Sequence, residues 1–459
     1  MDFKAQDLDY IPLHVHSCYS INDGLQNVGA IVKRASKLHI PAIAVTDWCN
    51  LAGFVRFYSA CKSAGIKPIM GADLKIREPG EIAGEEKFFW VTLLAMDRIG
   101  KQNLYDILSR AWLDTNSPNI ADVAATVDDL AKYSDGIILL NGFRGDIASY
   151  AQIDDHERID ERIAFYKKYY EGRFCFEITR TGRKGEGSFE ALALDLCIKY
   201  QIPPVASNDT RYLLGPQDTP EDGLSDAYIH RIRVCIQDGV QIGDKNIERE
   251  YSDQQFLRSP AQMRELFSDL PEALNNTRKI AERCNVDIQL DIPRLPHYNT
   301  GNLTPADCLR MEARKGLKKR LEFLFPDEQE REKKREEYEK RLETELDVII
   351  KMDFPGYFLI VMEFIQWSKD HGVPVGPGRG SGGGSLVAYA LRITDFDPIR
   401  FDLLFERFLN PERVSMPDFD VDFCQKKRAL TLQHVVDHYG RESVSQIAAF
   451  GTLAPKASL

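Results

Sequence analysis

Short apolar runs alternate with amphipathic helical stretches through the first half of the chain. The apolar runs predict strands at Leu13–His16, Pro41–Thr46, Lys67–Gly71, Gly136–Leu140, Phe174–Ile178 and Pro204–Ser207. Helical periodicity predicts helices at Val28–Leu38 and Gly53–Ala64. Such alternation is typical of parallel βα units, in which functional side chains gather at the carboxyl ends of the strands.

Helical periodicity dominates further along the chain. It predicts one helix at Pro271–Asn285 and a highly charged one at Glu328–Lys351. The second helix has one apolar stripe, formed by Tyr338, Leu342, Leu346 and Ile349. One short stripe favours a helix that rests a single face on a core over a coiled-coil partner. Prolines and a glycine interrupt the pattern near residues 285–300, where we place a domain boundary.

Composition and charge narrow the class of protein. The chain has 459 residues, enough for two or three domains. It shows no apolar run long enough to cross a membrane and no secretory signal, and its nine cysteines are scattered without a C-x-x-C pair. We therefore expect a reduced, cytoplasmic protein without membrane contacts. The net charge of −11 argues mildly against nucleic-acid binding, although a local groove can still be positive.

A glycine-rich segment, Val373–Ser385 (VPVGPGRGSGGGS), joins a short apolar strand to the helical stretch LVAYALRI. Glycines let backbone N–H groups approach an anion, and Arg379, Ser381 and Ser385 add side-chain donors, so the pattern indicates a phosphate cradle. The segment contains G-x-G-x-x-G, with Asp395 or Asp397 at the distance that a dinucleotide site requires, but no returning parallel strand is evident. A flexible linker is the other interpretation.

An acidic segment, Met416–Cys424 (MPDFDVDFC), follows about 40 residues later. On a strand, alternation would place Asp418, Asp420 and Asp422 on one face and the apolar residues on the other. Such carboxylates can hold two Mg²⁺ ions about 3.5–4 Å apart for nucleotidyl transfer. A solvated acidic edge strand is the alternative. The nearby phosphate-cradle pattern favours the metal–nucleotide interpretation.

The stretch from GPGRGSGGGS to MPDFDVDFC resembles the palm core of the C-family bacterial replicative polymerases nearly position for position, and FGTLAPKAS continues the match. The resemblance implies a nucleotidyltransferase-like palm in which Asp420 and Asp422 bind two catalytic Mg²⁺ ions. It also implies that Gly380 and Ser381 bind the nucleotide with Arg379 nearby. Arg407 and Arg413 are weaker candidates for phosphate contacts.

The family uses a third carboxylate further downstream. The resemblance therefore implies that a chain ending at Leu459 cannot polymerise DNA alone. It also implies primer–template DNA and dNTPs as substrates. A sliding clamp and a clamp loader would bind through regions beyond this chain.

A pair of histidines, His14 and His16, ends the first predicted strand. H-x-H is a common metal half-site, although two satisfied core histidines explain it equally well. LHVHSCYS resembles the opening motif of PHP domains, some of which carry a multi-metal phosphoesterase site, and VTDWCNLAGFVRFY, GIKPIMGAD and ASNDTRYL extend the match. The resemblance implies a distorted (β/α)7-type barrel. It implies a degenerate metal site whose remaining residues are His14, His16, Asp47, Asp73 and Asp209.

The departures from an intact PHP site are specific. Trp48 and Arg211 stand where such a site has histidines, Asp73 where it has glutamate, and Thr181 where metal-binding relatives have histidine. Lost imidazoles should remove most of the affinity for transition metals, and residual metal stays open. The resemblance implies a structural PHP domain, of the kind on which a separate proofreading exonuclease docks in the family.

These resemblances predict an α/β and α+β multidomain protein with a PHP domain at 1–285, an incomplete palm at 286–450 and the start of a thumb segment at 451–459. The leading hypothesis is the catalytic subunit of a template-directed DNA polymerase. A PHP metal-dependent phosphoesterase and a non-catalytic docking scaffold are the alternatives. His434 and His438 are spaced for zinc on a helix but lack the glutamate of H-E-x-x-H, so a surface helix is favoured.

Overall fold

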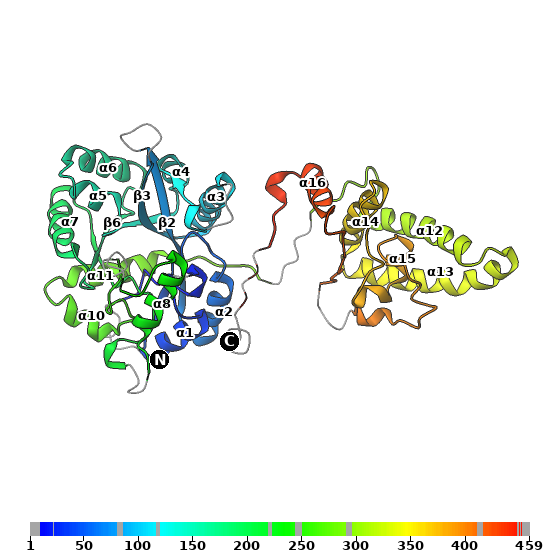
Figure 1. The fold of residues 1–459 in the computed structure, drawn as a ribbon, viewed down its shortest axis with the longest axis horizontal. Coiled ribbons are helices and arrows are strands. Elements are labelled where there is room, and N and C mark those ends of the chain that lie inside the picture. Colours follow the sequence, from blue (N-terminus) through cyan, green and yellow to red (C-terminus); the bar gives the residue numbers. More distant parts are fainter. Residues whose placement is uncertain are drawn as a thin grey trace. The chain divides into compact units, whose positions relative to one another are not determined.

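The computed structural model describes residues 10–21, 23–79, 86–115, 120–218, 223–243, 250–290, 296–410, 416–447, 449 and 451. The chain divides into two compact units, Met1–Gln289 and Leu290–Leu459, which we describe separately (Figure 1). The domain limits at 285 and 450 stay predictions. Nearly all of the segment 451–459 lies outside the described residues.

A seven-stranded sheet forms the centre of the first unit (Figure 1). Its strands are β1 (Ala42–Val45), β2 (Lys67–Pro79), β3 (Glu86–Ala95), β4 (Ala125–Thr126), β5 (Ile137–Asn141), β6 (Phe174–Thr179) and β7 (Pro204–Ser207). The order is β1-β2-β3-β5-β6-β7, with β4 paired to β2. Three of the pairs, β1–β2, β5–β6 and β6–β7, are parallel as expected, and the pair β2–β4 is parallel as well. Strand β3 was not predicted, and it runs antiparallel to both β2 and β5.

Helices connect these strands and surround the sheet (Figure 1). They are α1 (Val28–Lys37), α2 (Phe54–Ala64), α3 (Arg98–Asp114), α4 (Val127–Lys132), α5 (Asp146–Ala151), α6 (His156–Tyr169), α7 (Glu186–Tyr200), α8 (Asp226–Asp238), α10 (Pro260–Leu266) and α11 (Pro271–Arg283). Helices α10 and α11 begin at a proline, whose missing N–H costs nothing in the first turn. Among the described residues, no helix is both long and apolar enough to cross a membrane.

The predicted strand Leu13–His16 is reduced to a single bridge between Val15 and Thr210. Proline 12 has no N–H to donate, and the Val15 N–H donates to the Thr46 hydroxyl at 3.0 Å, so no regular ladder forms. The segment still accepts bonds from the backbone of β1 and exchanges bonds with Thr210 just after β7. It thereby links the two ends of the strand order, as expected for a distorted barrel.

Two kinds of residue share one face of the sheet. Alternate strand residues such as Ile69, Leu94 and Cys175 pack with Ile280 of α11 in a buried apolar cluster. Because side chains alternate along a strand, Asp73, Thr92 and Glu177 point to the same face as these residues but lie further along their strands. The α11 side of this face is thus apolar, and its other end carries polar groups.

The second unit is mainly helical among its described residues. Its helices are α12 (Pro305–Leu324), α13 (Glu328–Lys351), α14 (Pro355–Asp370), α15 (Leu386–Ala390) and α16 (Arg428–Tyr439). The predicted apolar stripe of α13 is buried, with Leu346 and Ile349 fully inaccessible. It packs on α12 and α15, which confirms a helix resting on a core.

Stability of the first unit should depend on pH through His230 of α8. This side chain is 1 % exposed, and its Nε2 has no hydrogen-bond partner. Burial and the Arg211 charge lower the pKa of His230 from 6.5 to about 4, although Asp23 opposes them. The unfolded chain therefore binds more protons than the native state between these values. The stabilisation is complete above about pH 6.5 and is lost progressively as the pH falls toward 4.

We expect acidification from about pH 7 to about pH 5.5 to cost about 1 kcal/mol through this group alone. His230→Leu should remove that part of the slope in urea unfolding followed by tryptophan fluorescence. A Trp367→Phe background leaves only tryptophans of the first unit as reporters. The exposed His156 provides the control His156→Gln. An unchanged slope in His230→Leu would contradict the prediction.

Candidate functional site

The first candidate site lies at the polar end of the sheet face that packs against α11 at its other end. His14, His16 and Asp73 bring ligand atoms within 4.8 Å of one another. The Nε2 atoms of the two histidines are 3.1 Å apart, and each lies 3.6 Å from Asp73 Oδ2. Imidazole nitrogens and a carboxylate are donors that transition metals accept, so these three residues could hold an ion.

Protonation works against a metal here. Burial alone would lower the pKa of His14, but attraction by Glu177, Asp209 and Asp73 raises it to about 10. Burial together with the charge of Arg211 lowers the pKa of His16 well below its usual value. His14 Nδ1 lies 2.8 Å from Glu177 Oε1, a contact that favours the protonated ring. A metal must displace that proton before it binds.

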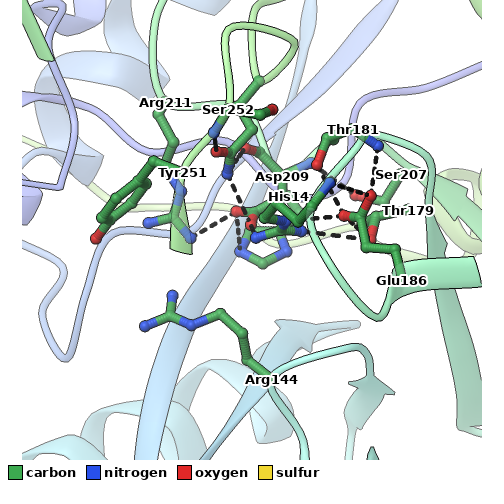
Figure 2. A network of polar contacts seen from close by, with 12 residues as sticks. His14, Arg144, Thr179, Thr181, Glu186, Ser207, Asp209, Arg211, Tyr251 and Ser252 are labelled. Atoms are coloured by element: carbon green, nitrogen blue, oxygen red, sulfur yellow. Dashed lines mark hydrogen bonds and ion pairs between the residues drawn. The ribbon is translucent and has the colours of Figure 1, made fainter. Parts of the chain in front are cut away.

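Two arginines form ion pairs with Asp209, the acidic residue next to this cluster. Arg183 Nη1 lies 2.7 Å from Asp209 Oδ2, and Arg211 Nη2 lies 2.5 Å from Oδ1. Both guanidinium groups are almost fully buried, and Arg211 also pairs with Asp23. Although burial opposes them, these charges hold the pKa of Asp209 well below its usual range. Figure 2 shows Arg211 beside Asp209, with Arg144 approaching the network from another strand end.

Other positions singled out by the PHP resemblance serve the fold in this structure. Asp47 stands outside the three-residue cluster, because its carboxylate accepts bonds from the Ser17 N–H, the Ser17 hydroxyl and the Ser20 hydroxyl, each at 2.7 Å. Trp48 packs edge-on against Trp90, with ring centroids 4.7 Å apart. Thr181 is buried and donates to Glu186 Oε1 at 2.7 Å (Figure 2).

The space at this site is small. A cavity of about 20 Å³ lies against His14, Asp73, Glu177, Arg183 and Asp209. That volume suits a single water molecule. A phosphoester substrate does not fit without rearrangement, which disfavours a working phosphoesterase.

The second candidate site brings Asp420 and Asp422 together with Arg379. Arg379 Nη1 lies 3.1 Å from Asp420 Oδ2, and Nε lies 3.3 Å from Asp422 Oδ1. All three side chains are about half exposed, between 41 % and 60 %. The glycine-rich segment and the acidic segment therefore meet, as their chemistry suggested, and both carboxylates face one cationic group.

Neither Val373–Val375 nor Met416–Cys424 forms the expected strand. Among the described residues, two isolated bridges join the glycine-rich segment to the acidic segment, Val375 to Phe423 and Arg379 to Asp420. Prolines 374, 377 and 417 remove backbone donors, which limits pairing to a few bonds such as Gly376 N–H to Asp422 O at 2.8 Å.

The expected alternation of side chains nevertheless holds. Phe419, Val421 and Phe423 pack against the core of the second unit, while Asp418 and Asp422 are exposed. The Tyr357 hydroxyl accepts a bond from the Phe419 N–H at 3.0 Å, and the two rings stack. Helix α14 thereby fixes the acidic segment.

The glycine-rich segment is a packed turn. Ser381–Gly384 forms one turn of 3₁₀ helix, and Ser385 caps α15 through the Ala388 N–H at 3.1 Å. A Cβ on Gly384 would lie 2.5 Å from the Leu404 carbonyl oxygen, and one on Gly382 would lie 2.5 Å from the Phe419 ring. This contradicts the flexible-linker interpretation.

The exposed part of the turn, Gly380 and Ser381, lies next to the carboxylates. A Cβ on Gly380 would approach Asp420 Oδ2 at 3.0 Å, and its positive φ of 75° suits glycine. The dinucleotide interpretation finds no support, because Asp395 pairs with Lys369 and Arg320, and Asp397 accepts from the Tyr338 hydroxyl.

The remaining sequence candidates lie elsewhere or outside the described residues. Arg407 is exposed at the end of a short 3₁₀ turn, Phe405–Arg407. Arg413 lies outside the described residues. His434 stacks on Trp367 and pairs with Glu363 at 2.7 Å, which fits the expected surface helix.

Sequence reasoning did not single out Glu177, Arg183, Glu186 or Arg144. Glu177 had a recognisable signal, since it is one charge inside the otherwise apolar or neutral strand FCFEIT. Arg144 and Arg183 follow the ends of β5 and β6, where parallel strands present functional groups.

Comparison with known proteins gives two family matches. Residues 12–181 match the PHP domain, and residues 307–459 match the bacterial DNA polymerase III alpha NTPase domain. A solved structure from Bifidobacterium adolescentis, titled a metal-dependent phosphoesterase, covers 49 % of this chain and 95 % of its own at 14 % identity. Its TM-score is 0.33, too slight a likeness to support an argument.

The similar curated proteins are DNA polymerase III subunits alpha. Those of Escherichia coli K12 and Vibrio cholerae O1 are 51 % and 47 % identical, each over 98 % of this chain and 38 % of the relative. That of Pseudomonas aeruginosa is 44 % identical over 98 % of this chain and 37 % of the relative. The chain therefore spans little more than a third of the length of these relatives.

Proposed function

We propose that this chain, which carries a PHP domain and is homologous over 98 % of its length to DNA polymerase III alpha subunits, forms part of the catalytic subunit of a bacterial replicative DNA polymerase. The full-length protein would add dNTPs to a primer 3′-end under the direction of a template. Its setting would be the cytoplasm, where it meets primer–template DNA and dNTPs.

The observation that carries this proposal is the meeting of two carboxylates with a glycine turn. Asp420 and Asp422 share Arg379, and Gly380 lies against Asp420. Exposed carboxylate oxygens are the hard donors that Mg²⁺ prefers, so the pair fits that ion. Bound Mg²⁺ would supply Lewis-acid stabilisation of the charge that develops in nucleotidyl transfer.

The chain's own groups would orient the nucleotide. Gly380 offers a backbone N–H beside the carboxylates, and Ser381 offers an exposed hydroxyl. Both groups can donate to a triphosphate. Arg379, which pairs with the carboxylates here, reaches the same place and can neutralise phosphate charge. Arg407 and Arg413 are weaker candidates for phosphate contacts.

The first unit, Met1–Gln289, contains the PHP match and is called the PHP unit; it is proposed as a non-catalytic scaffold. Its site could hold one metal ion on His14, His16 and Asp73, but the raised pKa of His14 and the buried arginines favour a metal-free ion network. A proofreading exonuclease subunit is the proposed partner of this unit. A sliding clamp and a clamp loader are proposed partners of the rest of the full-length protein.

Primer extension by the full-length protein tests the proposal. Purified protein, primed template, dNTPs and Mg²⁺ should give template-directed extension that EDTA abolishes. A parallel assay with a generic phosphoester and Mn²⁺ or Zn²⁺ addresses the phosphoesterase alternative. Phosphoester turnover without primer extension would overturn the proposal, and absence of both activities would leave the scaffold as the better account.

A further inference from the structure

A buried carboxylate, Glu345 of α13, lies behind the glycine turn. Its side chain is 1 % exposed and stands beside the apolar stripe of its helix. Burial raises its pKa above the usual range, against the effect of the Arg341 charge. A buried charge is costly unless its neighbours satisfy it, so the position calls for an explanation.

Both oxygens of Glu345 are used. Oε2 accepts from the Ser385 hydroxyl at 3.0 Å and from the Val387 N–H at 3.1 Å. Oε1 accepts from Arg341 Nε at 2.6 Å, one turn earlier on α13. The carboxylate thus ties α13 to the residue that ends the glycine turn and to the start of α15.

Arg341 holds the same turn by a second route. Its Nη2 donates to the Gly384 carbonyl at 3.1 Å and to the Leu403 carbonyl at 3.2 Å. Planar guanidinium donors can serve several acceptors at once, which lysine cannot do in the same geometry. Residues of α13 therefore hydrogen-bond to the turn at Gly384 and Ser385, while Gly382 packs closely against Phe419 of the acidic segment.

We infer that Glu345 and Arg341 act as a positioning pair that sets the glycine turn against Asp420 and Asp422. The inference rests on the proposed function, in which Gly380 and Ser381 of that turn hold the triphosphate. Neither residue touches the nucleotide. Their effect is to keep the phosphate-binding N–H and hydroxyl groups in register with the carboxylates.

A merely structural ion pair would show itself differently. It would lower the thermal stability of the protein without a selective effect on nucleotide binding. A positioning pair should raise KM for the dNTP more than it lowers kcat, and it should leave primer–template affinity unchanged, because only the turn is displaced.

The experiment uses the full-length protein in single-nucleotide incorporation. Glu345→Gln replaces one acceptor oxygen by a donor that faces either Arg341 or the Val387 N–H, and Arg341→Lys loses the shared carbonyl contacts. We expect each to raise KM for the dNTP about tenfold, the effect of one lost charge-assisted bond. Ser385→Ala is a milder variant that should move KM in the same direction. Melting temperature and primer–template Kd are measured alongside.

Glu343→Gln is the matched control, since Glu343 lies on the same helix but pairs with Arg310 and Arg314 at the surface. It should leave KM within twofold of the unmodified protein. Unchanged KM in both Glu345→Gln and Ser385→Ala, with an active unmodified protein, would overturn the inference and leave the proposed function standing. An unmodified protein that fails to extend primers would overturn both.

Discussion

Asp420→Asn and Asp422→Asn should each reduce kcat for primer extension by about a thousandfold or more in the full-length protein. Asparagine keeps the size of each side chain but replaces an anionic oxygen by an amide, which Mg²⁺ binds poorly. Both side chains are about half exposed, so the change should leave folding almost untouched. Single-turnover incorporation of one dNTP at saturating Mg²⁺ measures the effect.

Asp418→Asn is the control within the same segment. Asp418 is exposed like Asp422 but is not among the residues that face Arg379. We expect it to lose less than about tenfold, since a nearby charge alone contributes little through solvent. Equal losses in all three variants would indicate a general effect of acidity on this segment. Full activity in Asp420→Asn would place the metal ligands elsewhere.

The pairing of Arg379 with both carboxylates distinguishes Asp420 and Asp422 from a simple acidic patch. Removal of one carboxylate leaves the guanidinium paired with the other, so the two single variants should resemble each other in stability. The activity of the double variant should fall below that of the less active single variant by only a small factor. The reason is that the effects of residues that act as one unit are not additive.

The alternation of β and α elements could be predicted because burial follows a local period. Strands β1, β5, β6 and β7 lie within a residue or two of their predicted limits, and helix α13 matches its prediction. Strand β3 was missed because its antiparallel pairing with β2 and β5 depends on contacts that no local pattern encodes. Prolines limited the predicted strands Val373–Val375 and Met416–Cys424 to isolated bridges, although the side chains of the acidic segment kept their alternation.

The two candidate sites also differ in how far the sequence could predict them. The glycine turn and the acidic segment could be paired from sequence because their chemistry is complementary, and the structure places Arg379 on Asp420 and Asp422. The ion network of the PHP unit could not be foreseen, because Arg183 and Arg211 meet Asp209 only after β6 and β7 are aligned. Asp47 was assigned to the metal site by resemblance alone. In the structure, its carboxylate accepts hydrogen bonds from the hydroxyl groups of Ser17 and Ser20.

Loss of Arg211 should have the largest effect on the stability of the first unit. Arg211 is fully buried and pairs with both Asp209 and Asp23. Arg211→Met keeps much of the apolar stem but leaves Asp23 and part of Asp209 without a countercharge. Breaking a buried pair in this way costs about 3–5 kcal/mol. Urea unfolding of the first unit, followed by its tryptophans, measures the loss.

Two further variants separate the loss of the Arg211 charge from the loss of its side-chain volume. Arg278→Met removes a surface arginine whose pair with Glu282 is 47 % and 61 % exposed, and it should cost less than about 1 kcal/mol. Adding Asp23→Asn to Arg211→Met removes one of the stranded charges, so the double variant should be more stable than the sum of the single losses predicts. Strict additivity, or a loss as small as that of Arg278→Met, would show that the ion pairs of Arg211 do not stabilise this site.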